Sequence, residues 1–295
     1  INKPVRLIEL FTGIGAFATA LEYLNIDFEK YVTSEWEVNA VASYKAIHCK
    51  DDMLDYSNML TITDIENHLI NWGISTDGKN SLTEQQIKRR SEKWKRNTYN
   101  NFRATNNIGS IINAKGSDLG IVDTYKYEYI FTYSFPCQAL SLAGKREGMV
   151  ENSGTSSSLL WEVKRLLNEC LELPQILIME NVPQVHGKKN LPEFERWMSF
   201  LEDKGYNNYW YDMNAKDYGI PQSRNRCFMV SILNGYYEFP SKIPLKFKFK
   251  DFIEDKVEEK YYIDSTRKQC LLEQLIENNE LRERDRKSTR LNSSH

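Results

Sequence analysis

The feature that most constrains the fold is a short apolar run that ends in a glycine turn near the start of the chain. Residues 5–11 read VRLIELF, and TGIGAF follows directly, which places Gly13 and Gly15 two residues apart. The apolar run predicts a buried strand, and residues 16–23 then follow the spacing of a helix. A strand, a glycine turn and a helix in this order are typical of nucleotide-binding α/β folds.

The rest of the chain alternates between strand-like and helix-like segments. Further strands are predicted at residues 28–34, 129–134, 176–179, 209–213 and 226–233, and helices at residues 37–47, 158–171 and 191–204. This alternation predicts an α/β fold, a Rossmann-like sheet with helices on both faces. Residues 50–115 are polar, and we interpret them as a partly helical insertion.

Composition excludes several classes of protein. No apolar run approaches the roughly 18 residues of a membrane span. The five cysteines are widely spread and form no CxxC pair, which argues against a disulfide framework or a zinc site and favours a reducing compartment. The 39 Lys and Arg residues against 41 Asp and Glu residues give a net charge of −2, which is less typical of a nucleic-acid binder.

Both ends of the chain are unusual. The chain starts at Ile1, and no charged and then apolar leader opens it, so no secretory signal is expected. Residues 285–295 (DRKSTRLNSSH) resemble a translated sequencing adapter, and we expect them to be an artefact. Removing their three cations and one carboxylate moves the net charge from −2 to −4. The reading frame is expected to continue past residue 284.

An acidic residue and an aromatic residue follow the second predicted strand. Glu35 lies 20 residues after Gly15 and can accept hydrogen bonds from ribose hydroxyls, and Trp36 can stack on an adenine ring. These positions predict an adenosine cofactor without separating NAD from S-adenosylmethionine. The alternative is a tight turn with an incidental surface Glu and a core Trp.

A cysteine lies on the loop after the strand at residues 129–134. Cys137 follows Pro136, whose ring restricts the backbone, at the strand end where α/β sheets place reactive groups. A thiolate there is a good nucleophile, and residues 139–155 form a candidate lid. The alternative is an inert buried cysteine, which is our interpretation of the other four: Cys49, Cys170, Cys227 and Cys270.

An acid and two arginines complete the set. Glu180 ends the strand at residues 176–179, so it emerges at the same sheet edge as Cys137 and can act as a proton donor. Arg224 and Arg226 lie two residues apart where a turn enters the last strand. We expect them to point to opposite faces, so that at most one faces a given pocket. The alternative to a functional role, for each residue taken alone, is that Glu180 is a solvated carboxylate and that Arg224 and Arg226 are surface arginines.

These segments together resemble a known family. ELFTGIGAF, SEW, FPCQALSLAGKREG, ENV and DYGIPQSRNR occur in the order and approximate spacing of the DNA cytosine C5-methyltransferases of bacteria or phages, over about residues 5–250. The resemblance implies S-adenosylmethionine as cofactor, S-adenosylhomocysteine as product, no metal, and a cytosine flipped out of double-stranded DNA as substrate.

The resemblance also implies roles for individual residues. In the catalytic set these are Cys137 as nucleophile, Glu180 at cytosine N3, Arg226 at O2, Arg224 supporting the loop and pocket, Ser141 at the target phosphate, and Asn181 bracing the acid motif. In the cofactor pocket they are Phe11, Gly13, Ile14 and Gly15 at the glycine turn, Glu35 and Trp36 at ribose and adenine, Asp118 and Leu119 at the adenine amino group, and Ser134, Pro136 and Leu159 completing the pocket.

The family pattern sets the expected domains and partners. We expect a catalytic domain at residues 1–250 with the insertion at 50–115, the start of a target-recognition region at 251–284, and the artefact at 285–295. The rest of that region and the last family motif are missing, so we expect the fragment to be inactive. The basic stretch at residues 88–96 is expected to be a solvated face, and contact with DNA phosphates is the alternative. Expected partners are double-stranded DNA and a cognate restriction endonuclease, in a cytoplasmic monomer.

Three other functions remain open. A tRNA cytosine-5 methyltransferase can use the same scaffold, and a nucleotide-binding oxidoreductase can use a catalytic cysteine. The third is a DNA-binding relic without activity, which the intact set of Cys137, Glu180 and Arg226 disfavours.

Overall fold

A computed structural model of the chain describes residues 3–138, 140, 148–254, 256–258, 261 and 266–277. The chain divides into two compact units, one of residues 1–218 with 222–243 and one of residues 219–221 with 244–295. In the second unit the structure describes a short 3₁₀ helix, Phe249–Phe252, and α8, Thr266–Glu277. No helix among the described residues combines the length and apolar character needed to cross a membrane.

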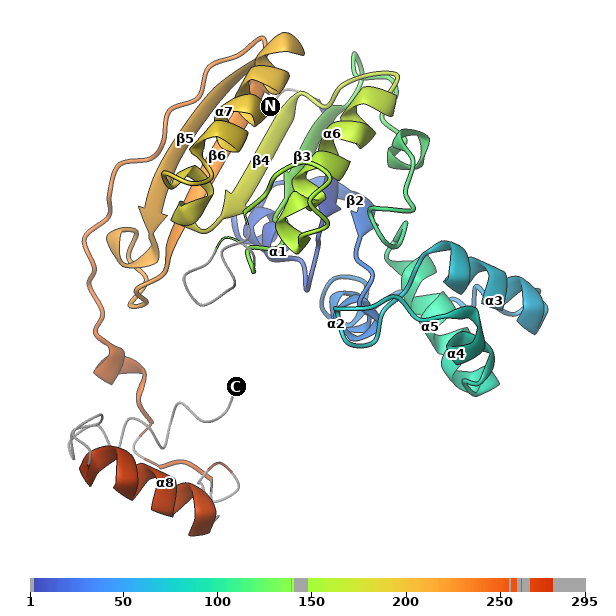
Figure 1. Cartoon of the computed structure of the whole chain (residues 1–295), viewed down its shortest axis with the longest axis horizontal. Coiled ribbons are helices and arrows are strands. Elements are labelled where there is room, and N and C mark those ends of the chain that lie inside the picture. Colours follow the sequence, from blue (N-terminus) through green and yellow to red (C-terminus); the bar gives the residue numbers. More distant parts are fainter. Residues whose placement is uncertain are drawn as a thin grey trace. The chain divides into compact units, whose positions relative to one another are not determined.

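The first unit is built on one six-stranded sheet (Figure 1). The strands are β1 (Val5–Leu10), β2 (Phe28–Ser34), β3 (Glu128–Tyr133), β4 (Ile176–Asn181), β5 (Tyr206–Asn214) and β6 (Asn225–Leu233). Their order is β2-β1-β3-β4-β6-β5. β1 to β4 pair in parallel, whereas β6 runs antiparallel to both β4 and β5. The predicted α/β fold is confirmed, with a direction change that the alternation of elements did not reveal.

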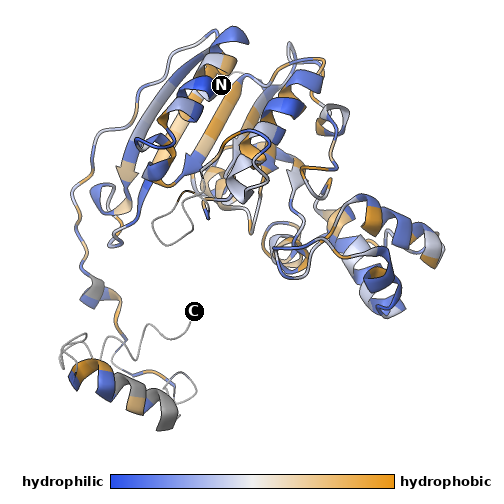
Figure 2. Cartoon of the chain, viewed as in Figure 1, coloured by the Kyte–Doolittle hydropathy of each residue, from blue (hydrophilic) through white to orange (hydrophobic). Residues whose placement is uncertain are grey.

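Helices cover both faces of this sheet, because residues on the strands alternate between two apolar faces. On one face, α6 (Leu160–Glu169) and α7 (Leu191–Asp203) pack over the sheet, and Trp197 of α7 is fully buried and donates a hydrogen bond to the Tyr133 hydroxyl at 3.0 Å. On the other, α1 (Ala16–Tyr23) buries Ala18 against Leu7 and Ile130. Figure 2 shows the hydrophobic residues concentrated in the central strands.

The polar insertion folds around a small core of its own. After α2 (Val38–His48) it contains α3 (Ile62–Asn71), α4 (Glu84–Lys88) and α5 (Glu92–Ala104). Trp72 stacks on Tyr99 and Phe102 with ring centroids 5.5 and 4.9 Å apart, above a buried aliphatic cluster. The prediction that this insertion is partly helical is confirmed.

Several cations of the basic stretch at residues 88–96 stabilise this subdomain from within. Lys95 is only 4% exposed and forms an ion pair with Glu66. The expectation that this stretch is a solvated face was therefore wrong for Lys95. Arg96 pairs with Glu92 at 2.8 Å and donates a hydrogen bond to the Ser57 carbonyl. A buried ammonium needs such a partner, because an isolated one is costly to desolvate.

One carboxyl group is buried beneath the glycine turn. Glu9 of β1 is 2% exposed, and it accepts hydrogen bonds from the Tyr44 hydroxyl at 3.0 Å and the Ala18 amide at 3.3 Å. Burial raises the pKa of Glu9 above its ordinary value, and these hydrogen bonds offset only part of the rise. The folded protein therefore holds a proton on Glu9 at pH values where the unfolded chain has released it.

This shift predicts a pH-dependent effect of Glu9→Gln. A carboxyl whose pKa is raised on folding contributes stability below its unfolded pKa, and that contribution is lost as the pH rises through the folded pKa. We therefore expect the free energy of unfolding of Glu9→Gln, relative to the wild type, to increase as the pH rises from the ordinary glutamate range. Urea denaturation at several pH values measures it.

Glu172→Gln is the control with the opposite sign. Hydrogen bonds from Thr124 hold the pKa of Glu172 below its ordinary value. Its contribution is present above the unfolded pKa and is lost as the pH falls, so Glu172→Gln is destabilising at neutral pH and less so in acid. The same pH trend for both variants would contradict the argument.

Candidate active site at the sheet edge

Three chemical groups meet where β3 and β4 end. Cys137 lies on the loop after β3, and Glu180 lies near the end of its parallel neighbour β4. Because β6 is antiparallel to β4, the beginning of β6 reaches this same edge. Arg226 Nε lies 3.0 Å from Glu180 Oε1, and Arg224 Nη2 lies 3.5 Å from the same oxygen.

Both arginines therefore reach the acid, so the expectation that they point to opposite faces was wrong. Residues two apart on a strand share a face, so Arg226 lies on the same face as Phe228, the residue paired with Glu180. Arg224 precedes β6, which begins at Asn225, and its long side chain reaches the same carboxylate. Glu180 is 21% exposed at the side chain, so solvent screens these ion pairs only in part.

The backbone of the cysteine loop is held from two sides. Asn181, which is buried, donates from Nδ2 to the Phe135 carbonyl at 3.0 Å and accepts the Val182 amide at 2.8 Å. The Ser157 hydroxyl donates to the Pro136 carbonyl at 2.7 Å. These bonds join the residues before Cys137 to β4 and to the 3₁₀ helix Ser156–Leu159, which precedes α6. Ser141 and, of the candidate lid, residues 139 and 142–147 lie outside the described residues.

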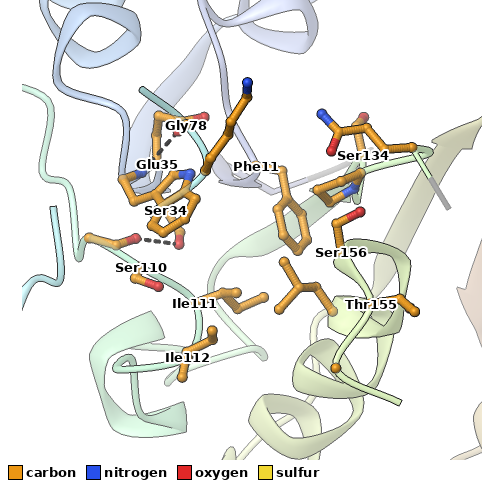
Figure 3. A pocket seen from close by; sticks show the side chains of 17 residues that line it. Phe11, Ser34, Glu35, Gly78, Ser110, Ile111, Ile112, Ser134, Thr155 and Ser156 are labelled. Atoms are coloured by element: carbon orange, nitrogen blue, oxygen red, sulfur yellow. Dashed lines mark hydrogen bonds between the residues drawn. The ribbon is translucent and has the colours of Figure 1, made fainter. Parts of the chain in front are cut away.

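A pocket of about 540 Å³ opens at the same edge (Figure 3). Six predicted cofactor residues line it: Phe11, Glu35, Trp36, Ser134, Pro136 and Leu159. Phe11 lies between Glu35 on one side and Ser134 and Ser156 on the other. Pro136 and Gln138 both line the pocket, so Cys137 between them is adjacent to it.

Glu35 is a half-buried acceptor with a fixed direction. Its carboxylate accepts the backbone amides of Gly13 at 3.0 Å, Trp36 at 2.9 Å and Glu37 at 2.9 Å. Burial raises the pKa of Glu35, and these three hydrogen bonds oppose the rise. A carboxylate can accept about four hydrogen bonds, so the group keeps capacity for a ligand.

The glycine turn shapes the pocket without lining it. Gly13, Ile14 and Gly15 are not among the lining residues. Gly13 has φ +56° and donates its amide to Glu35, while a Cβ on Gly15 would lie 2.4 Å from His48 Nε2. Phe11 also adopts a left-handed φ of 56°, which is uncommon for a bulky residue and marks a constrained backbone at the pocket.

The structure does not bring Asp118 and Leu119 to the pocket. Leu119 is fully buried in the main core, and Asp118 accepts the Lys115 amide at 2.8 Å, which caps a 3₁₀ helix. Ser110 and Ile111 line the pocket instead. The segment Gly109-Ser110-Ile111 is held at the pocket, because the Gly109 carbonyl accepts a hydrogen bond from the hydroxyl of Ser34, at the end of β2, at 2.8 Å.

The insertion contributes a wall that the sequence analysis missed. Gly78 and Lys79 line the pocket. Their loop is attached beside Trp36, because the Ser75 amide donates to the Trp36 carbonyl at 2.8 Å and the Val38 amide donates to the Ser75 carbonyl at 2.9 Å. The remaining lining residues are Ser34, Gly109, Ile112, Gln138, Gly154, Thr155 and Ser156.

Comparison with known proteins shows similarity over most of the chain. The chain is 37% identical over 264 residues to the Type II methyltransferase M2.ScrFI of Lactococcus lactis subsp. cremoris, which covers 88% of this chain and 70% of that protein. It is 37% identical over 254 residues to the orphan methyltransferase M.SssI of Spiroplasma monobiae, which covers 81% of this chain and 62% of that protein.

Solved structures share the fold at low sequence identity. The Dnmt2 methyltransferase of S. pombe matches with a TM-score of 0.53 and 18% identity, covering 89% of this chain and 63% of that one. A putative DNA modification methyltransferase encoded within an E. coli prophage matches with a TM-score of 0.53 and 15% identity, covering 88% of this chain and 58% of that one.

A family model for C-5 cytosine-specific DNA methylases matches residues 5–74 and 70–294. These residues include the glycine turn after β1, the cysteine loop, Glu180 of β4, and Arg224 and Arg226 at the start of β6. With this match and the 37% identity to the two methyltransferases, the chain belongs to the C-5 cytosine-specific DNA methylase family.

Proposed function

We propose that the protein transfers a methyl group from S-adenosylmethionine to carbon 5 of a cytosine flipped out of duplex DNA, through a covalent bond between Cys137 and the base. The observation that carries this proposal is the Glu180 carboxylate, held by Arg226 at 3.0 Å and Arg224 at 3.5 Å, at the sheet edge that also bears Cys137. An acid and a cation beside a nucleophile match the polar edge of a cytosine ring, which a flipped base presents.

The pocket beside this set fits an adenosine cofactor. Its volume of about 540 Å³ is in the range of small-molecule sites. Trp36, Ile111 and Ile112 offer apolar surface for an adenine ring, and Glu35 offers a half-buried acceptor for ribose hydroxyls. When bound, S-adenosylmethionine supplies an electrophilic methyl group on a sulfonium. No metal enters this proposal.

The residues of the site act on the base where charge develops. The Cys137 thiolate adds to carbon 6, while Glu180 in its protonated form gives a proton to N3 and Arg226 donates a hydrogen bond to O2. The electron pair displaced toward carbon 5 makes that atom nucleophilic, and carbon 5 then takes the methyl group. A base removes the carbon 5 proton, the thiolate leaves carbon 6 with its electron pair, and the N3 proton returns to the Glu180 carboxylate.

The substitution Cys137→Ala tests the nucleophile. We expect methyl transfer to duplex DNA to fall to background, because no covalent adduct can form, while binding of S-adenosylhomocysteine changes less than about threefold, which is under 1 kcal/mol. Transfer of labelled methyl groups and titration calorimetry measure the two properties on the full-length protein.

Cys170→Ala is the matched control. Cys170 is partly buried, and its thiol donates weakly to the Gly116 carbonyl, so this variant should keep its activity. Methyl transfer by Cys137→Ala would overturn the covalent mechanism. Labelling of tRNA rather than duplex DNA would identify the tRNA enzyme instead, and binding of NAD in place of S-adenosylhomocysteine would indicate an oxidoreductase.

Glu35→Ala tests the cofactor pocket. Loss of hydrogen bonds to a charged acceptor costs about 1.5–3 kcal/mol, so we expect S-adenosylhomocysteine to bind about 10 to 100 times more weakly. Calorimetry gives the affinity, and a thermal melt checks that the variant folds. Glu35→Gln, which keeps one acceptor oxygen, should lie in between.

Asp118→Ala separates the geometry of the pocket from the sequence-based assignment. Since Asp118 caps a 3₁₀ helix away from the pocket, this variant should bind S-adenosylhomocysteine as the wild type does. A loss of affinity as large as that of Glu35→Ala would show that the pocket has been assigned to the wrong residues.

A further inference from the structure

A second cluster of reactive side chains lies where β5 and β6 pair. It consists of His186, Asp212 and Cys227, whose nitrogen, oxygen and sulfur atoms all lie within 4.8 Å of one another. His186 Nε2 lies 2.9 and 3.1 Å from the two carboxylate oxygens of Asp212. Neither the catalytic set nor the cofactor pocket uses any of these residues.

The fold itself brings the three groups together. Asp212 and Cys227 are directly opposite in the antiparallel β5–β6 pair, so their side chains are cross-strand neighbours on one face of the sheet. His186 ends the 3₁₀ helix Pro183–His186, which follows β4, and its ring packs 4.6 Å from Trp210 on the same face of β5. The donors therefore come from three separate elements.

Among the described residues, no lysine or arginine balances the charge at this cluster. Within the part of the chain that the structure describes, Asp212 forms an ion pair with His186 and with no Lys or Arg. The side chains of Asp212 and His186 are 32% and 22% exposed, so an ion can reach them from solvent, while Cys227 is fully buried beneath. Burial, and next the Asp212 carboxylate, raise the pKa of the Cys227 thiol to about 12, so without a cation the thiol keeps its proton.

Sulfur, imidazole nitrogen and carboxylate oxygen are the donors that Zn²⁺ takes in proteins. Around a tetrahedral zinc ion, neighbouring donor atoms lie about 3.5 Å apart, so these three need only small side-chain rotations to close on one ion. Harder ions such as Mg²⁺ and Ca²⁺ prefer sites made of oxygen alone.

We propose that Cys227 Sγ, His186 Nε2 and an Asp212 oxygen bind one thiophilic divalent cation of the zinc class, with solvent as the fourth ligand. The thiol proton passes to solvent as the sulfur–metal bond forms, and the imidazole binds in its neutral form. The bound ion links the segment that follows Glu180 and Asn181 to the β5–β6 pair. It lies on the face opposite the Glu180–Arg226 pair, because Glu180 pairs with Phe228 and Asn181 pairs with Cys227.

Cobalt substitution tests this site directly. Co²⁺ is titrated into the full chain after treatment with a chelator, and its absorption spectrum is recorded. We expect one equivalent to produce a thiolate-to-cobalt charge-transfer band and the intense visible bands of a tetrahedral site, and Zn²⁺ to displace both.

Variants assign the ligands. Cys227→Ser should remove the charge-transfer band, and His186→Ala, at a partly exposed position that folding tolerates better, should weaken Co²⁺ binding at least tenfold. Cys170→Ser and Cys137→Ser, which change thiols outside the cluster, should keep the wild-type spectrum. Absence of the band in the wild type, or its survival in Cys227→Ser or at full affinity in His186→Ala, would overturn the proposal. Methyl transfer is measured separately, so failure here leaves the proposed function intact.

Discussion

The candidate active site depends on the reversal of one strand. β6 runs against β4, and only for this reason do its first residues lie beside the end of β4, where the Arg226–Glu180 ion pair forms at 3.0 Å. Arg226 is the second residue of β6, which ends at Leu233, so in a parallel orientation Arg226 would lie near the opposite end of the strand, about 23 Å away. The parallel pairing of β3 with β4 adds the cysteine loop to the same edge.

Much of this arrangement could be predicted from local sequence. The bounds of β2 and α1 were predicted at residues 28–34 and 16–23 and are observed there, because an apolar run and a helical spacing are local signals. Strand direction is not a local signal, so the reversal of β6 was missed. The net charge was also a poor guide to the site, because a sum of −2 over the whole chain does not reveal that two arginines contact one carboxylate.

The pocket shows the limit of local reasoning most clearly. Asp118 and Leu119 have the residue types expected beside an adenine, yet the chain uses Asp118 as a cap and Leu119 as core. The residues that do reach the pocket, Ser110 and Gly78 among them, arrive through pairings between segments far apart in sequence, such as Thr33 with Asn107 and Glu37 with Ser75. No periodicity within the polar insertion records such a pairing.

The strand pair β4–β6 holds two groups of polar side chains on opposite faces of the sheet. Successive side chains of a strand point to opposite faces, so Glu180 and Arg226 face one side of the sheet while Asn181 and Cys227 face the other. Asn181 connects the two, because its side chain holds the backbone before Cys137 while its strand neighbour belongs to the His186 cluster. A structural change at the His186 cluster can therefore be transmitted to the cysteine loop through Asn181 and the backbone. The groups that contact the Glu180 carboxylate stay the same.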